Sequence, residues 1–423
     1  MDLLLKNGKV INHDSEKNAD ILIKDGKISG VSSDIKADND IELIDCKDNY
    51  ILPGLIDMHV HFRDPGLEYK EDIISGSDAA AAGGITTCFP MANTKPVNDN
   101  DSVTSYMVNK AREYGKIDLF PVGSITKKMK GEELAEMGEM KKAGALAFSD
   151  DGLPVLSSEV MRRGLEYASG IGAFIISHSE DISLAGNGVI NEGEISTITG
   201  LKGIPAEAEE IMIARDILLS KLTGAHIHIA HVSTKGSVDL IRRAKEQGLN
   251  VTCEAAPHHF TFTEEELLNY DTNYKMNPPL RAKEDVKCIK EALKDGTIDI
   301  IATDHAPHHP DEKFVEFDNA PNGIIGLQTL IPLTLKLVNE GIIDIKQFVK
   351  LTSYMPSVIS GLADRGEIKE GKTADITVID PEKTYLYDKN INKSKAENSP
   401  LLGSGLKGLA LCTIKNGKVV HKS

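Results

Sequence analysis

The stretch YILPGLIDMHVHFRDPG, residues 50–66, joins a short apolar run to a group of polar side chains. The apolar part, 50–60, predicts a buried strand. It ends at His59 and His61, and Arg63 follows two residues later. Side chains two residues apart lie on the same side of an extended segment. We therefore expect the two histidines to point in one direction, with the arginine beside them if the extension continues.

Similar strand-like runs recur along the chain, and helical stretches separate many of them. One such stretch, 233–248, has apolar residues at helical spacing and stops at Gly248. Strands that alternate with helices predict an α/β fold with a parallel sheet. Eight strands in roughly 300 residues suit a (β/α)8 TIM-like barrel, with a doubly wound open sheet as the main alternative. The eight segments are 55–60, 85–89, 117–123, 144–150, 172–178, 225–233, 250–259 and 298–306.

The two ends of the chain have similar sequences. Residues 4–11 (LLKNGKVI) and 413–420 (TIKNGKVV) are apolar runs around Asn-Gly, and 21–29 carries Asp-Gly. These dipeptides are strong hairpin signals. Both termini are therefore expected to form hairpins that pair into one small sheet domain. GSGLKG (403–408) fits a dinucleotide-binding pattern but neither follows a clear strand nor opens a helix, so a surface loop is expected there.

Composition excludes several classes of protein. A formal net charge of −16 over 423 residues argues against nucleic-acid binding, whose footprint is basic. Five cysteines without a C-x-x-C pair are typical of a reducing compartment. The first residues show no signal peptide, and no apolar run approaches a membrane span. We expect a cytoplasmic protein without a membrane partner.

Polar residues gather where the expected strands end, which in a barrel enzyme is the active-site face. Four histidines and two carboxylates exceed what one tetrahedral zinc needs, and they suit two divalent ions with a shared carboxylate. Asp150 and Asp151 are both candidates for that shared position. The candidate ligands are His59, His61, Asp150 or Asp151, His178, His231 and Asp304.

Each of these residues also has a structural interpretation. An isolated H-x-H is more often structural, and His226 and His228 form a second one that lies inside its strand and is expected to be buried. Asp151 could belong to a turn and Asp304 to a helix cap. The remaining histidines could be solvated in loops; they are His258, His259, His305, His308 and His309. The joint placement at successive strand ends favours the metal interpretation.

Taken together, these motifs resemble the cyclic amidohydrolases, and specifically the dihydroorotase family whose metals are bridged by an aspartate. The resemblance runs from about residue 3 to residue 420. It implies a metal-bearing barrel over 53–354 and a small β-sandwich from 1–52 and 355–423. The motifs are DMHVHFRDPG, PMANTKPV, FSDDG, ISHSE, IAHVSTKGS, KMNPPLR, IATDHAPH and TADITVID.

The resemblance implies the reversible closure of N-carbamoyl-L-aspartate to L-dihydroorotate, with loss of water, in pyrimidine synthesis. A hydroxide between two zinc ions attacks the ring amide carbonyl in the ring-opening direction. Asp304 acts as general base and then as general acid. The family pattern assigns His59 and His61 with Asp304 to one zinc, His178 and His231 to the other, and the bridge to Asp151.

The resemblance also implies a set of substrate contacts. Arg63 offers a planar fork of donors to the carboxylate that both substrates carry, and Asn93 adds an amide donor. Asn322 stands where an aromatic residue is common, and Ala92 where proline is common. No lysine occupies the bridging position, so carbamylation is not expected. The implied substrate-binding residues are His61, Arg63, Asn93, Asn277, His308, Asn322 and Gly323.

Two alternative functions remain open on the sequence. One is another cyclic amidase, such as a dihydropyrimidinase or an allantoinase, whose substrates lack the ring carboxylate. The other is a non-catalytic relative that scaffolds aspartate transcarbamoylase, although this chain keeps all the expected ligands. The resemblance implies a homodimer and leaves open an association with aspartate transcarbamoylase. Residues 305–323 are long and polar, as in a lid over the site.

Overall fold

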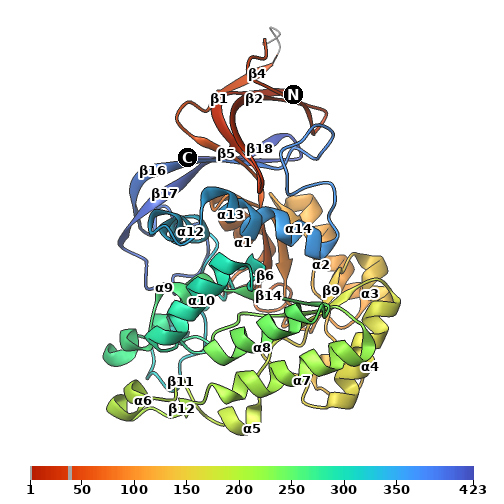
Figure 1. Ribbon diagram of the computed structural model, residues 1–423, viewed down its shortest axis with the longest axis vertical. Helices are drawn as coiled ribbons and strands as arrows, with labels where there is room; N and C mark the ends of the chain where they lie inside the picture. The colour runs from red at the N-terminus through yellow and green to blue at the C-terminus, as the bar shows by residue number, and fades with distance from the viewer. Residues whose placement is uncertain (1, 37–40) are drawn as a thin grey trace.

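The computed structural model describes residues 2–36 and 41–423. Figure 1 shows a mainly stranded part, which holds both chain ends, above a larger body of strands and helices. The stranded part is one mixed sheet of order β18-β17-β16-β5-β1-β2-β3, and β4 pairs with β1. The strands are β1 (Leu3–Ile11), β2 (Glu16–Lys24), β3 (Lys27–Ser32), β4 (Glu42–Asp45), β5 (Tyr50–Pro53), β16 (Ile376–Tyr387), β17 (Ser404–Lys415) and β18 (Lys418–Lys422).

This terminal sheet encloses a core of its own. Ile28 of β3 and Ile414 of β17 stand far apart in the strand order but belong to the same buried apolar cluster. The sheet must therefore curl until its two ends share one core. Hydrogen bonds join its strands into one continuous sheet, whereas the resemblance implied a sandwich.

The three hairpin signals have different outcomes. Asp25-Gly26 connects β2 to β3, and Asn416-Gly417 connects β17 to β18, as predicted. The prediction is wrong at Asn7, which lies inside β1 at a shift in the register with β2. Asn7 has a φ of 64°, and its backbone N–H donates to Asp20 Oδ1 at 3.0 Å. A left-handed residue in an antiparallel pair also fits a bulge, so the dipeptide alone does not separate a bulge from a turn.

Within the described residues, the two main sheets of the larger body contain eight strands in parallel pairs. Its two main sheets have the orders β6-β7-β8 and β9-β10-β13-β14-β15. Parallel bridges from Gly123 to Phe148 and from Val60 to His305 join these sheets at both ends, so the order closes on itself, unlike an open doubly wound sheet. The strands are β6 (Leu55–Val60), β7 (Ile85–Pro90), β8 (Asp118–Leu119), β9 (Ala147–Phe148), β10 (Phe174–Ser177), β13 (Ile227–Ile229), β14 (Val251–Ala255) and β15 (Ile300–Ile301).

Helices alternate with these strands and lie outside them (Figure 1). The helix expected over 233–248 is α8, Lys235–Glu246. Thr234 caps it by accepting from Ser237 N, and it buries Val238, Ile241 and Ala244. The other long helices are α1 (Ile73–Ala82), α2 (Asp101–Tyr114), α3 (Met137–Ala143), α4 (Ser158–Gly170), α7 (Glu207–Thr223), α10 (Lys283–Asp295) and α12 (Leu330–Asn339).

Short elements fill the connections of this body. The pair β11 (Ile190–Asn191) and β12 (Gly203–Ile204) has no counterpart in the sequence prediction. The remaining helical segments are α5 (Ile182–Ala185), α6 (Glu194–Thr199), α9 (Pro257–Thr261), α11 (Pro310–Lys313), α13 (Ile345–Val349), α14 (Met355–Ser360), η1 (Lys127–Met129), η2 (Glu264–Asn269), η3 (Thr272–Tyr274) and η4 (Lys350–Tyr354).

Strand β17 packs the terminal sheet onto the larger body. The hydroxyl of Thr413 in this strand donates to Ala81 O at 2.7 Å, and a Cβ at Gly408 would meet Leu335 of α12 at 2.4 Å. The expected surface loop over 403–408 is therefore wrong, since most of it is the start of β17, paired with β16. Gly408, one of the glycines that suggested a loop, instead permits this close approach.

Candidate metal centre and active site

All the expected ligands come together at the carboxyl ends of the parallel strands. His59 lies in β6 and His61 directly after it, while His178 directly follows β10. Every one of these side chains is buried, as are Asp151 after β9, His231 after β13 and Asp304 after β15. Six polar side chains from the ends of five strands thus occupy one small region. They are far apart in the sequence and come together only in the folded chain.

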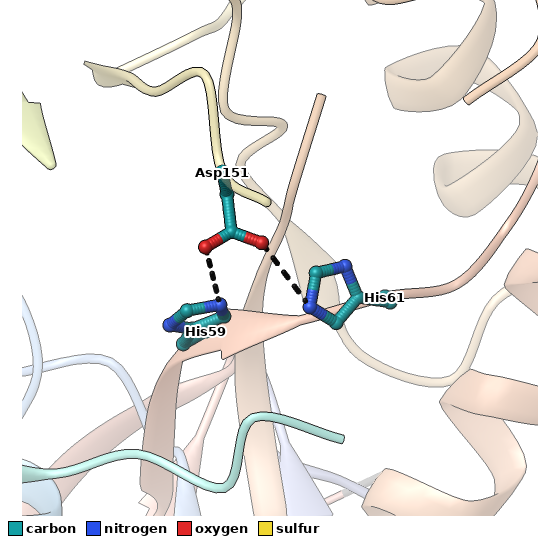
Figure 2. Close-up of side chains that lie close together, drawn as sticks. All are labelled: His59, His61 and Asp151. Atoms are coloured by element: carbon teal, nitrogen blue, oxygen red, sulfur yellow. Dashed lines mark ion pairs between the residues drawn. The ribbon is translucent and has the colours of Figure 1, made fainter. Parts of the chain in front are cut away.

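Asp151 lies at the middle of this cluster. Figure 2 shows its two oxygens facing the two histidines of the first H-x-H: Oδ1 lies 3.4 Å from His59 Nε2, and Oδ2 lies 3.5 Å from His61 Nε2. Oδ1 also lies 3.4 Å from His178 Nδ1 and 3.6 Å from His231 Nε2. Two potential metal-binding groups result, and Asp151 belongs to both.

Asp304 faces the same two histidines from the other side. Its Oδ1 lies 3.0 Å from His61 Nε2 and 3.5 Å from His59 Nε2. Burial alone raises the pKa of Asp304, but the neighbouring imidazoles of His59 and His61 lower it to well below its usual range. The carboxylate is therefore charged at neutral pH.

The residues fit a pair of divalent cations. His59 Nε2 and Asp151 Oδ1 are buried and find no hydrogen-bond partner among the described residues. Unpaired buried polar atoms are costly unless something satisfies them, and a cation between these two atoms would do so. Burial alone lowers the pKa of His178, yet Asp151 and Glu180 raise it to about 10. The cluster therefore attracts positive charge.

Asp150 and Asp151 are adjacent but have different surroundings. Asp150 Oδ1 accepts from Ile125 N at 2.8 Å and from Thr126 N at 3.1 Å, and its Oδ2 accepts from the Thr126 hydroxyl. Asp150 thus uses both oxygens to hold a neighbouring loop. Of the two aspartates left open by the residue pattern, only Asp151 faces the histidines.

Two further residues fix the orientation of the first H-x-H. Glu254 Oε1 lies 2.6 Å from His59 Nδ1, and Asn93 Oδ1 lies 3.0 Å from His61 Nδ1. Each partner accepts a hydrogen bond when Nδ1 carries the proton, and each Nε2 then keeps a lone pair directed at the carboxylates. The sequence prediction missed Glu254; its only signal is a carboxylate inside a buried strand.

Three residues of the site adopt left-handed backbone conformations. The φ angles are 60° for Arg63, 30° for His231 and 49° for Asp304. Such angles cost of order 1–3 kcal/mol for residues other than glycine, and they concentrate at functional sites. Backbone strain is therefore present at the positions that direct these three side chains into the site.

A cavity of about 260 Å³ opens beside the cluster. Within the described residues, the side chain of Arg63 makes a single hydrogen bond, from Nε to Pro307 O at 3.3 Å, so its terminal nitrogens remain for a ligand. Burial lowers the pKa of Arg63 to about 10, and the group stays charged at neutral pH. The lining residues are His61, Arg63, Asn93, Asp151, Gly152, His178, His231, Met276, Asn277, Asp304, Ala306, His308 and Asn322.

Two of the expected substrate contacts, His308 and Gly323, make hydrogen bonds within the protein. His308 Nε2 donates to Asn322 O at 2.9 Å, and its Nδ1 accepts from Lys70 Nζ at 3.3 Å. Gly323 does not line the cavity, and its N–H donates to Lys275 O at 2.9 Å. These two residues shape the wall that presents Asn322.

Asn277 lines the cavity and pairs with a residue that the sequence prediction missed. Its Nδ2 donates to Glu180 Oε2 at 3.2 Å, and the same oxygen lies 3.7 Å from His178 Nε2. Glu180 therefore couples a substrate-facing amide to a candidate metal ligand.

Two buried lysines donate hydrogen bonds to backbone carbonyls of the segment 305–323. Lys275 Nζ donates to Phe317 O and Asp318 O, and Lys313 Nζ donates to Pro321 O and Gly323 O. Burial, together with the charge of Lys275, lowers the pKa of Lys313 to about 7. Closure of this segment on substrate stays a prediction.

The alternative of solvated loop histidines is wrong for most of the histidines it covered. His258, His259, His305 and His308 are all buried, and His259 Nε2 lies 3.0 Å from Pro278 O. His309 has a side chain that is 44% exposed and fits the loop interpretation.

Comparisons with known proteins agree with this geometry. A family model described as dihydro-orotase-like matches residues 48–237. The curated dihydroorotase of Geotalea daltonii is 54% identical over 424 residues, and that of Geobacter metallireducens is 55% identical over 424 residues; each alignment covers 100% of both chains.

Solved structures with lower sequence identity have a similar fold. The L-hydantoinase (dihydropyrimidinase) of Arthrobacter aurescens has a TM-score of 0.90 at 26% identity, covering 100% of this chain and 96% of that one. The dihydropyrimidinase of Brevibacillus agri has a TM-score of 0.87 at 25% identity, with 100% and 95% coverage. Within the described residues, no helix is long and apolar enough to cross a membrane. Full-length identity above half places this chain in the dihydroorotase family.

Proposed function

We propose that this protein is a dihydroorotase that interconverts N-carbamoyl-L-aspartate and L-dihydroorotate in pyrimidine biosynthesis, with two zinc ions per chain. One observation carries the proposal: Asp151 is shared by two groups of imidazoles on the wall of a cavity that also holds Arg63. The shared carboxylate suits a hydrolase with two metals, and the arginine suits a substrate with a carboxylate. The curated relatives named above support this activity.

The ligand types and their spacing support two cations. His59, His61 and Asp304 would hold one, His178 and His231 the other, and Asp151 would bridge them. When bound, the cations polarise the ring amide carbonyl and make water a nucleophile at neutral pH. Imidazole with carboxylate favours zinc among the divalent ions.

The side chains around the cations would divide the remaining tasks. Asp304 accepts a proton at Oδ1 or Oδ2 during ring opening and returns it to the departing ring nitrogen. Arg63 meets the substrate carboxylate with its two terminal nitrogens, and Asn93 Nδ2 adds a donor while its Oδ1 holds His61. The charge of Arg63 also offsets the overall negative charge of the protein near an anionic substrate.

The architecture we propose follows from the pairing. The closed order of eight parallel strands would be a (β/α)8 barrel over 53–354, with its active site at the carboxyl ends of the strands. Residues 1–52 and 355–423 would form the second domain. The homodimer, the cytoplasmic location and any association with aspartate transcarbamoylase stay predictions.

The decisive experiment is hydrolysis of L-dihydroorotate with metal removed and restored. We expect the purified protein to contain about two divalent ions per chain, as in other two-metal sites. A chelator should abolish turnover, and zinc should restore it. Active enzyme with almost no bound metal would refute the metal centre, and efficient turnover of dihydrouracil without turnover of dihydroorotate would refute the substrate.

A further inference from the structure

The second H-x-H, His226 and His228, lies outside the proposed metal centre but is connected to it. His59 Nδ1 lies 2.6 Å from Glu254 Oε1, and Glu254 Oε2 lies 3.2 Å from His228 Nε2. His228 Nδ1 lies 2.8 Å from Thr252 Oγ1, and His226 Nε2 lies 2.8 Å from the same oxygen. Five side chains thus form one unbroken series of hydrogen bonds.

Strand geometry explains how these side chains reach one another. Thr252 and Glu254 are two residues apart in β14, so they share a face of the sheet. His228 lies in the neighbouring strand β13, and His226 directly precedes that strand. His228 is paired directly with Thr252 in the parallel register of β13 and β14. The series therefore runs along two adjacent strands, away from the carboxyl ends where His59 lies.

Burial changes steadily along this series. His59, Glu254 and His228 are all at most 1% exposed, while Thr252 and His226 are half-buried. At the outer end, the imidazole of His226 stacks on Phe174 with ring centroids 5.1 Å apart. The inner members therefore depend on each other for their hydrogen bonds, and the outer end is fixed by packing.

The identity of each atom sets the direction of each bond. A carboxylate only accepts, and Glu254 Oε1 also receives the backbone N–H of His231 at 3.3 Å. His59 Nδ1 and His228 Nε2 must therefore both be donors. With one proton on each imidazole, His228 accepts at Nδ1 from the hydroxyl of Thr252, whose oxygen accepts from His226 Nε2. This arrangement of protons satisfies every member of the series.

We propose that His226, Thr252, His228 and Glu254 form a positioning column that fixes the tautomer and orientation of His59 as a metal ligand. This proposal rests on the two-cation centre proposed above. Thr252 is central to the column, because its hydroxyl group contacts both histidines of the second H-x-H. None of the four residues touches the substrate cavity.

Nitrogen NMR of metal-loaded protein with labelled histidine tests the directions of these bonds. In wild type, His59 should carry its proton on Nδ1, and His228 should carry its proton on Nε2 with an unprotonated Nδ1. The Thr252→Val substitution should shift the His228 Nδ1 resonance, since it loses its donor. A protonated His228 Nδ1 in wild type would overturn the column.

Metal release to a competing chelator tests the consequence for the centre. Loss of a group that orients a ligand typically weakens metal affinity about 10- to 100-fold, so Glu254→Gln and Thr252→Val should release metal at least about tenfold faster. Thr252→Ser keeps the hydroxyl and should behave like wild type. Thr413→Val is the matched control, since it removes a buried threonine hydroxyl that donates to Ala81 O in the terminal sheet.

The outcomes separate the column from the proposed function. Equal release from wild type, Thr252→Val and Thr413→Val would overturn the column and leave the metal centre intact. Equal acceleration in Thr252→Val and Thr413→Val would show a general loss of stability and also overturn it. A wild type that binds no divalent cation would refute the metal centre itself, and if Thr252→Val does not fold, the NMR of wild type alone decides.

Discussion

The two H-x-H motifs of this protein have the same sequence pattern and different surroundings. His59 and His61 stand at the carboxyl end of β6, and each Nε2 faces both Asp151 and Asp304 within 3.5 Å. Four charged or chargeable groups thus meet at a point where a cation fits. The first motif is suited to binding a cation because its strand ends there.

In the second motif, His226 directly precedes β13 and His228 lies in the middle of that strand. His226 and His228 share one hydroxyl, that of Thr252, at 2.8 Å each. Among the described residues, Glu254 is the one carboxylate that pairs with His228, and it also contacts His59. The same spacing therefore favours the positioning role that we propose for the second motif.

Position relative to the strand end decides between these roles. The carboxyl ends of parallel strands converge on one face, where loops leave room for a ligand, whereas mid-strand positions face other side chains. The residue two positions further sharpens the contrast, since the first motif is followed by Arg63 and the second by Ala230. Only the first continues into a cavity.

The largest expected effect concerns Asp304, which only the first motif contacts. Asp304→Asn keeps the shape but removes the proton acceptor, so dihydroorotate turnover should fall about 10²- to 10⁴-fold. Steady-state kinetics measure turnover, and a separate binding assay measures substrate affinity. We expect substrate binding to persist in the variant. Asp311→Asn in the same segment, with a side chain that is 91% exposed, should leave turnover unchanged. Full turnover in Asp304→Asn would remove this residue from the mechanism.

Arg63 should show the next largest effect. Truncation of one partner of a buried charge pair costs about 2–4 kcal/mol, so Arg63→Ala should reduce kcat/KM for dihydroorotate about 30- to 1000-fold. Dihydrouracil lacks the carboxylate, and its hydrolysis should change far less. Arg63→Lys keeps the charge but loses the planar fork, so its kcat/KM for dihydroorotate should lie between those of wild type and Arg63→Ala. Equal losses on both substrates would contradict the pairing.

Asp151 and Asp150 allow a neighbouring pair to be compared. A cation that binds only the folded protein at 100 times its Kd raises the free energy of unfolding by about 3 kcal/mol. Zinc should stabilise wild type by this order, and Asp151→Asn should lose the gain. Asp150→Asn should keep it, although its loop contacts weaken. Denaturant unfolding with and without zinc measures both, and an equal gain in Asp151→Asn would exclude Asp151 as the bridge.

Much of the site could be predicted because its signals are local. Apolar runs that end in histidine or aspartate place His59, His178 and Asp304 at strand ends, and a parallel fold then collects them. The eight strand segments follow from the same periodicity. Short motifs that occupy strand ends therefore carry more information than the same motifs elsewhere.

The residues that orient the ligands carry no such signal. Glu254 is one carboxylate in a buried strand, and its partner His59 is 195 positions away in the chain. Glu180 and Lys70 likewise acquire their roles only when the strands and loops meet. The left-handed angle of Asn7 marks a bulge, and only its contact with Asp20 separates this from a hairpin. Such choices depend on tertiary contacts that one sequence does not display.

The smallest expected effect is a pH dependence of stability that belongs to the second motif. Burial and the neighbouring His228 lower the pKa of His226 to about 4, whereas an unfolded histidine titrates near 6.5. Between these values the unfolded chain binds more protons, so the free energy of unfolding rises with pH. The contribution is complete above about 6.5 and is lost as the pH falls toward 4; it amounts to about 1–3 kcal/mol for a half-buried group.

His226→Gln tests this dependence, because glutamine can still donate to Thr252 but does not titrate. We expect the difference in unfolding free energy between wild type and variant to change by this amount from pH 4 to pH 7 in metal-free protein. Denaturant titrations at several pH values measure it. A difference that is constant with pH would mean that His226 is exposed to solvent and free to protonate in the folded protein, and the second motif would then lose its fixed outer end.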